Sequence, residues 1–272
     1  RTSGRPDLSI HFQSLRSSSA GNCLALWTST SSILVDCGVR VQRDCREMLD
    51  AHRRRAGHLD AVVVSHAHGD HMAYGSLRVL AREGIRVLAD AHVAGQLRDW
   101  HRTDEWKQQP DLRAFARGGF DVGDFRVTPF EVPHAPHVPN FAFVISARGR
   151  TATRTIVVCT DLYDYAGILP HLDGAHFVFI EANHDLELLR QHPNFNSRYH
   201  LNNVKTASLL HHGVERGAAA PKAVMLGHLS EERNRPARAV AEVTRMFARQ
   251  GTAMRFRLDA APARRPSEVV EL

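Results

Sequence analysis

Short apolar runs and longer amphipathic stretches alternate along the chain. Compact runs rich in Val, Ile and Phe favour buried strands, whereas apolar residues that recur every three or four positions favour helices. The pattern predicts strands over residues 10–15, 23–28, 33–36, 59–64, 85–88, 125–132, 141–146, 155–160, 177–181, 223–226 and 254–258. It predicts helices over residues 41–55, 72–82, 92–101, 186–191, 204–216 and 236–249.

The order of these elements indicates an architecture. Blocks of strands are followed by helices, twice over, which favours an α/β fold of two mixed sheets packed face to face with helices outside, and not one doubly wound sheet. The sequence shows no internal repeat and no dividing linker, so we expect one domain over residues 1–272. Residues 260–272 are rich in Ala, Pro and Arg, and we expect them to form a loose tail.

The composition is that of a globular protein with 43% hydrophobic residues, and no apolar run approaches the roughly 20 residues of a membrane span. Residues 1–8 lack the apolar segment of a secretory signal peptide. The four cysteines show no C-x-x-C spacing, which fits a reducing compartment. We therefore expect a cytoplasmic protein with no membrane partner and no obligate protein partner.

The net charge of +6 comes almost entirely from arginine and permits a nucleic-acid partner without requiring one. The basic run Arg53–Arg55 stands at the end of a predicted helix, where positive charges are favoured. A contact between this run and DNA is the alternative interpretation.

The densest candidate chemistry is the segment from Ser65 to His71, which directly follows the predicted strand 59–64. It contains His66, His68, Asp70 and His71 in the order His-x-His-x-Asp-His. In an extended segment the first two histidines point the same way, and after the turn at Gly69 the other two residues can reach a second centre. Imidazole and carboxylate groups are typical zinc ligands, so the segment predicts a metal site.

Further strands end in a potential ligand: His134, Asp161 and His228 each follow one. Taken singly each could be structural, and His137 lies close to His134. We expect one ion to be bound by His66, His68 and His134, and a second by Asp70, His71 and His228. Two ions need a bridging carboxylate, which Asp161 would supply together with a shared water. The ligand types accommodate zinc or manganese, and iron is a further option.

Several longer motifs resemble the metallo-β-lactamase superfamily, and within it the WalJ/YycJ group of DNA exonucleases. The resemblance covers nearly the whole chain. Besides the histidine cluster, it rests on five further segments. These are Ser17–Asn22 as a Ser/Gly-rich loop with Ala20 in place of a Ser, Asp36-Cys37-Gly38 as a D-x-G turn, Glu181–Asp185 as E-x-N-H-D, His200–Asn203 as H-L-S-N with Asn202 in place of the Ser, and Gly227–Ser230 followed by Asn234-Arg235-Pro236.

The resemblance implies a four-layered αββα sandwich and a role for polar residues outside the ligand set. Asp70 could orient the nucleophile as well as bind metal, and His184 and His200 could act on the leaving group. The substrate phosphate could contact a loop and a segment near the site, through Ser18, Ser19, Gly21, Asn22, Asn183 and Asp185. The alternatives are a plain hairpin turn for the loop, and supporting hydrogen bonds or a helix cap for His184, His200, Asn183 and Asp185.

These observations favour a metal-dependent phosphodiesterase, and above all a DNA exonuclease that uses hydroxide activated by two metal ions. One alternative is hydrolysis of a thioester, lactone or β-lactam by the same metal pair. Another is an RNA-processing nuclease, although Asp161 and His228 are too close in sequence for the long insertion of the β-CASP nucleases. A regulatory protein with structural metal is disfavoured, because structural zinc sites are usually closed by four protein ligands.

Overall fold

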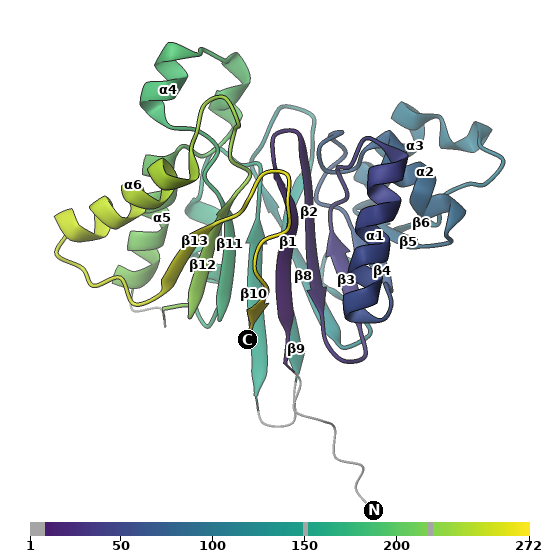
Figure 1. Cartoon of the computed structure of the whole chain (residues 1–272), viewed down its shortest axis with the longest axis horizontal. Coiled ribbons are helices and arrows are strands. Elements are labelled where there is room, and N and C mark those ends of the chain that lie inside the picture. Colours follow the sequence, from purple (N-terminus) through teal and green to yellow (C-terminus); the bar gives the residue numbers. More distant parts are fainter. Residues whose placement is uncertain (1–8, 149–151, 217–219) are drawn as a thin grey trace, which may run out of the picture.

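In the computed structural model, which describes residues 9–148, 152–216 and 220–272, two seven-stranded sheets pack face to face (Figure 1). Helices cover the outer faces of this pair, so the four-layered αββα arrangement expected from the sequence is confirmed. Residues 1–8, on which the expectation about a signal peptide rests, lie outside the described part.

The first sheet has the strand order β14-β1-β2-β3-β4-β5-β6. Its strands are β1 (His11–Ser18), β2 (Gly21–Trp27), β3 (Ser32–Val35), β4 (Ala61–Val63), β5 (Arg86–Ala89), β6 (Leu112–Ala114) and β14 (Val270–Glu271). Neighbours are antiparallel from β14 to β3 and parallel from β3 to β6. The connections contain α1 (Gln42–Ala56), α2 (Tyr74–Arg82), α3 (Ala91–His101) and the short 3-10 helix η1 (Thr103–Glu105).

The second sheet has the strand order β13-β12-β11-β10-β9-β8-β7. Its strands are β7 (Phe120–Val122), β8 (Phe125–Val132), β9 (Asn140–Arg148), β10 (Thr153–Cys159), β11 (Phe177–Glu181), β12 (Ala223–Gly227) and β13 (Arg257–Ala260). The sheet is parallel from β10 to β13. The connections contain the 3-10 helices η2 (Ala166–His171) and η3 (Phe195–Tyr199) and the helices α4 (Leu186–Gln191), α5 (Asn203–Glu215) and α6 (Pro236–Arg249).

The internal strand β11 shows how the layers are held together. Phe177 and Phe179 point toward the other sheet, where the ring of Phe177 lies 4.5 Å from that of Phe12. Val178 and Ile180, which alternate with them, pack into a second cluster with α5 and α6. Since successive side chains of a strand point to opposite faces, an unbroken apolar run is required wherever both faces are buried. Strand β11 therefore fixes the position of Glu181, which ends it.

Residues 260–272 do not form the loose tail expected from their composition. Strand β14 pairs with β1, and the backbone N–H of Leu272 donates to the Ile10 carbonyl at 3.0 Å. Val270 and Leu272 are buried. The segment covers an edge of β1 that would otherwise present unpaired backbone groups, as the yellow end of the chain in Figure 1 shows.

Most predicted elements are present, with shifted ends. The last large strand was expected over residues 254–258 and is found at Arg257–Ala260. The short strands β6, β7 and β14 had no counterpart in the prediction. Within the described ranges, none of the helices has the length and apolar character that crossing a bilayer would require.

Candidate metal centre

The predicted ligands come together at one end of the two sheets, although they are spread over most of the sequence. Each follows a strand: the cluster from His66 to His71 comes after β4, and His134, Asp161 and His228 come after β8, β10 and β12. A loop that leaves a rigid strand places its side chains with little freedom. The apolar strands therefore act as the scaffold of the site.

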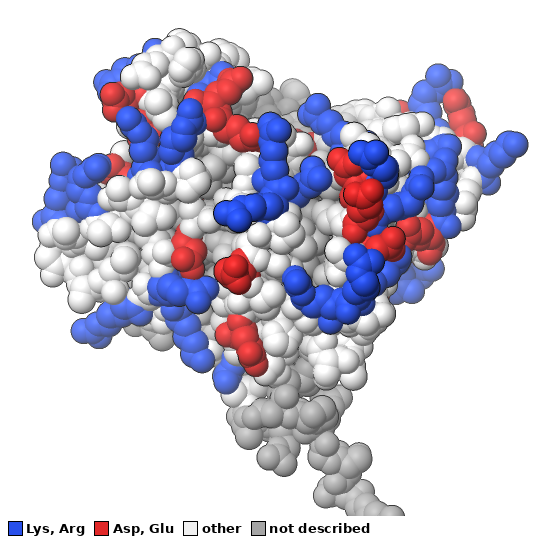
Figure 2. Space-filling view, in the orientation of Figure 1, with Lys and Arg blue, Asp and Glu red and all other residues white. Residues whose placement is uncertain are grey.

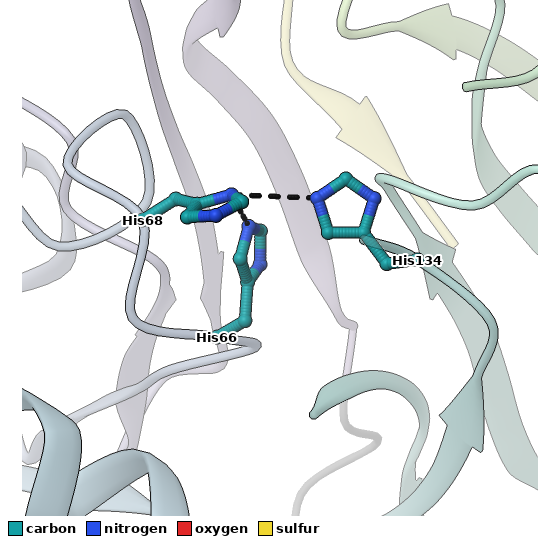
Figure 3. A group of neighbouring side chains, drawn as sticks. All are labelled: His66, His68 and His134. Atoms are coloured by element: carbon teal, nitrogen blue, oxygen red, sulfur yellow. Dashed lines mark hydrogen bonds between the residues drawn. The ribbon is translucent and has the colours of Figure 1, made fainter. Parts of the chain in front are cut away.

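The first group consists of three histidines (Figure 3). His66 Nε2 lies 3.0 Å from His68 Nδ1, and His134 Nε2 lies 3.3 Å from the same His68 atom. Three ring nitrogens that converge in this way offer lone pairs to a single cation. Burial lowers the pKa of all three histidines, which favours the neutral form that binds metal.

The second group consists of Asp70, His71, Asp161 and His228. His228 Nε2 lies 3.3 Å from Asp70 Oδ2, and His71 Nε2 lies 3.6 Å from that oxygen. Burial disfavours protonation of His71 and His228, but the surrounding carboxylates outweigh it, and they raise the pKa of His228 to about 10. Both rings thus lie in a strongly negative environment suited to a cation.

Asp161 lies between the two groups. Its Oδ1 is 3.9 Å from His134 Nε2 of the first group, and its Oδ2 is 2.7 Å from His71 Nε2 of the second. The buried Oδ2 accepts no well-aligned hydrogen bond from any described residue. A buried carboxylate oxygen without such a bond is costly, and a cation would satisfy it. The donor set therefore fits divalent metal ions.

The backbone at the ligands is also unusual. Asp161 and His228 have φ values of 59° and 52°, in the left-handed region that is unfavourable for residues with a side chain. Strain of this kind costs of order 1–3 kcal/mol and is concentrated at functional sites. The fold maintains this backbone strain at Asp161 and His228, the two candidate ligands of the second group that lie far from the His66–His71 segment in sequence.

Buried carboxylates outside the ligand groups orient the rings. Asp36 Oδ2 lies 2.7 Å from His71 Nδ1, and Asp36 is itself held by the backbone N–H and the hydroxyl of Ser65, at 2.8 and 2.9 Å. Because Nδ1 of His71 is occupied by Asp36, Nε2 faces the metal position. Carboxylate–histidine–metal arrangements of this type raise ligand basicity.

Glu181 orients two histidine rings in the way that Asp36 orients His71. The sequence did not lead us to expect a role for Glu181 itself in the site. Its Oε1 lies 2.6 Å from His200 Nδ1 and 2.8 Å from His228 Nδ1. Its Oε2 accepts hydrogen bonds from the backbone N–H groups of Leu162 and Leu201. A Glu directly after the apolar run of residues 177–180 was the available signal in the sequence. Asp161, Glu181, His200 and His228 are close enough to form a further possible metal group, but these bonds already occupy Glu181.

The loop expected to contact substrate is used mainly to hold the ligand segment. The Asn22 side-chain amide donates to the Ser18 and Asp70 carbonyls, at 3.1 and 3.3 Å, and the Asn22 backbone N–H donates to the Asp70 carbonyl. The Ser18 hydroxyl donates to Glu231 at 3.4 Å. The structure therefore places Ser18, Gly21 and Asn22 in supporting contacts, and Ser19 at the pocket wall.

Two glycines let the backbones of this region meet. A Cβ on Gly38 would lie 1.8 Å from the Asp70 carbonyl oxygen, and one on Gly21 would lie 2.5 Å from the Gly38 carbonyl oxygen. Both contacts are shorter than real Cβ atoms allow. The position of Asp70 therefore depends on the absence of side chains at these turns.

The segment from Asn183 to Asp185 divides into different roles. Asn183 lines the pocket, and its side-chain amide donates to the His228 carbonyl at 3.0 Å. His184 is buried, is not part of the pocket wall among the described residues, and has its pKa lowered to about 4 by burial. Asp185 caps α4 by accepting from the Glu187 and Leu188 N–H groups, both at 3.0 Å. The capping alternative thus holds for Asp185, and its contact with substrate stays a prediction.

A pocket of about 510 Å³ opens onto the site. Its wall contains several candidate ligand residues and His200. Residues of the segment between α4 and α5 also line it, together with Ala135, Pro136, Val138 and Arg233. The cavity is large enough for the end of a polymeric substrate, and slightly more of its wall is polar than apolar.

The face of the molecule visible in Figure 2 carries side chains of both charges. In Figure 2, basic and acidic side chains are interspersed over the visible surface. Of the basic run at the end of α1, Arg53 forms an ion pair with Glu83 at 2.6 Å, and Arg55 donates to Gln13. These contacts fit the interpretation of the run as a helix terminus, and neither arginine is in the pocket wall at the metal site.

The sequence matches the family described as the beta-lactamase superfamily domain over residues 31–228. That range covers most of the chain and contains every ligand named above, so the chain belongs to the metallo-β-lactamase superfamily. It is similar to exodeoxyribonuclease WalJ of Streptococcus pneumoniae, with 29% identity over 247 residues and 84% of each protein covered. It is also similar to exodeoxyribonuclease YycJ of Bacillus anthracis, with 28% identity over 67% of this chain and 66% of the relative.

Comparison with solved structures agrees with this family assignment at the level of the fold. The metallo-beta-lactamase fold protein YhfI from Bacillus subtilis superposes with a TM-score of 0.70 at 17% identity, covering 97% of this chain and 99% of its own. Human tRNase Z, short form, superposes with a TM-score of 0.62 at 14% identity, covering 96% and 98%. At these identities the likeness concerns the fold. Fold, family and the His/Asp groups together define a metal-dependent hydrolase near the WalJ/YycJ group.

Proposed function

We propose that the chain is a DNA exonuclease that works with two divalent metal ions. The observation that carries this proposal is the position of Asp161, with one carboxylate oxygen beside each of the two ligand groups. A single structural ion would need only one closed set of four ligands. Two adjacent open sets joined by one carboxylate are typical of hydrolytic two-metal sites.

In this proposal His66, His68 and His134 would hold one ion, Asp70, His71 and His228 would hold the other, and Asp161 would serve both. When bound, such ions lower the pKa of a shared water and neutralise the charge that develops on a phosphate. The identity of the ions is open between zinc, manganese and iron, since His/Asp ligands suit all three.

The protein contributes positioning groups around the ions. Asp70 lies in the pocket wall and is the candidate for orienting the attacking water. His200 also lines the pocket, and its Nδ1 is occupied by Glu181, so its Nε2 is the atom available to donate a proton to the departing oxygen. Ser19, Asn183 and Arg233 line the same cavity and offer donors to a phosphate.

The choice of DNA is supported by the relatives, which are named exodeoxyribonucleases and align over most of this chain. The polar cavity suits a charged polymer better than a small neutral lactone. The four buried free cysteines are consistent with activity in the cytoplasm.

The test is incubation of the purified chain with end-labelled single- and double-stranded DNA and RNA. Each substrate is combined with zinc, with manganese, and with chelator. We expect stepwise shortening of DNA that requires metal and is abolished in Asp161→Asn. The control variant is Asp173→Asn, which alters an exposed carboxylate outside the site.

Alternative outcomes identify the rival functions. Degradation of RNA without DNA would indicate an RNA-processing nuclease. Efficient hydrolysis of a thioester or lactone by a metal-loaded protein that leaves both nucleic acids intact would overturn the proposal.

A further inference from the structure

The rim of the pocket carries an exposed aromatic side chain. Phe195, at the start of η3, is 71% exposed, and no other large apolar side chain among the described residues is exposed to that extent. A single exposed ring is common on protein surfaces, but this one offers an apolar face beside the pocket that a ligand could cover.

An arginine holds one side of this ring. The guanidinium carbon of Arg198 lies 3.4 Å from the centre of the Phe195 ring and 4.5 Å from the centre of the Tyr199 ring. Arg198 also donates a hydrogen bond to the Tyr199 hydroxyl. Cation–π contacts on two rings restrict the arginine and orient Phe195. The stack is ordered, yet most of the Phe195 ring remains free.

The stack adjoins the candidate metal centre. Asn194 and Asn196, on either side of Phe195, line the pocket, as does Tyr199. The Tyr199 carbonyl oxygen lies 3.2 Å from Nδ1 of His134, a candidate ligand. In Figure 1 the segment from α4 toward α5 projects beyond the sheets, at the end where the hairpin between β1 and β2 also lies. A substrate that reaches the metal centre therefore passes beside this segment.

We propose that Phe195 and Arg198 form a stacking platform for an unpaired nucleobase close to the scissile phosphate. This inference rests on the proposed nuclease function and specifies the form of its substrate. A base has a face free for an aromatic ring only when it is unstacked, as at a single-stranded or frayed end. Every base has such a face, so the platform selects single-stranded ends without selecting sequence. Arg198 adds a positive charge beside the backbone.

The experiment combines a change in the protein with a matching change in the substrate. Cleavage of a single-stranded oligonucleotide is compared with cleavage of the same strand lacking its terminal bases, which are replaced by abasic tetrahydrofuran residues. Both substrates are given to the wild type, Phe195→Ala and Phe195→Trp. Trp100→Ala is the matched control, because Trp100 is another exposed aromatic residue but lies on α3.

We expect Phe195→Ala to raise KM for the normal strand by about 5- to 150-fold, the range that one base–aromatic stack provides. Phe195→Trp should retain the wild-type KM, and Trp100→Ala should not change it. For the abasic strand, the wild type and Phe195→Ala should have the same KM, since the partner of the ring is already missing. Equal KM values of the wild type for the normal and abasic strands would overturn the platform while leaving the nuclease function intact.

A binding measurement separates the two proposals. Fluorescence anisotropy of a labelled strand with phosphorothioate linkages reports Kd without rapid cleavage. If the wild type shortens no DNA with any metal, the nuclease proposal fails. The platform is then supported if Phe195→Ala weakens binding of the normal strand but not of the abasic strand. It fails if the Kd of the normal strand is unchanged.

Discussion

Asp36 Oδ2 lies 2.7 Å from Nδ1 of His71, and this contact determines which nitrogen of the ring faces the pocket. Asp36→Asn should retain the fold and weaken metal binding by about 10- to 100-fold, because removing an orienting carboxylate typically has this effect. Metal content after dialysis against graded chelator would measure it. A variant that keeps both ions as tightly as the wild type would show that Asp36 has no role in orienting His71.

Substitution of Asp161 and substitution of Asp70 should have different effects on the metal content of the protein. Asp161→Asn should lose activity and at least one ion, because its oxygens lie beside both ligand groups. Asp70→Asn should abolish activity while leaving the ion held by His66, His68 and His134 largely in place. Elemental analysis alongside activity tests this. Wild-type turnover in either variant would remove that residue from the mechanism.

His200 and His184 were both candidates for catalysis, and the structure separates them. His200→Gln should lower kcat by about 100-fold or more with metal content nearly intact, as expected for loss of a proton donor. His184→Gln should mainly lower the melting temperature, because His184 is buried and does not line the pocket within the described part of the chain. The reverse pattern, with kcat lost only in His184→Gln, would contradict the assignment.

His52 should make the fold sensitive to acid. Burial, and then the charges of Arg55 and Arg53, lower its pKa from 6.5 to about 4. The unfolded chain takes up a proton below pH 6.5 and the folded chain does not, so this contribution to stability is complete above pH 6.5 and is lost as the pH falls toward 4. The loss is about 3 kcal/mol at most. Urea unfolding from pH 7.5 to 4.5 should show a shallower decline for His52→Gln than for the wild type.

The segment after Ala260 should be required for stability. Truncation there removes buried Val270 and Leu272 and exposes the edge of β1. We expect a loss of roughly 3–5 kcal/mol from apolar burial, and a tendency to aggregate through the open edge. Thermal unfolding and light scattering would report both effects. Val269→Ala, at a partly exposed neighbour, is the control and should behave like the full chain.

The convergence of the candidate ligands could be anticipated because it depends on local patterns. Four candidate ligands follow one strand within six residues, and the others each end a recognisable apolar run. Sheet packing brings such strand ends together, so the chemistry of the residue types was enough to group them.

Other features depend on contacts that the sequence does not encode locally. The pairing of β11 with β12 decides whether Glu181 faces His228. In the same way, the pairing of β3 with β4 decides whether Asp36 can orient His71. Asn22 is a polar loop residue by sequence, and only the fold shows that its donors are already used. The ordering of the segment after Ala260 comes from a partner strand at the other end of the chain, which composition cannot indicate.

No side chain fits at Gly21 or Gly38, because an added Cβ would meet backbone oxygen at 2.5 or 1.8 Å. Random mutagenesis should therefore recover almost no functional substitutions at these positions, although neither glycine has a functional group. If related proteins adapt to a different metal ion, their substitutions should fall outside these glycines, at residues such as Asp36 and Glu181 that orient the candidate ligand rings. The backbone of these turns would then persist in descendants whose catalytic preferences had diverged.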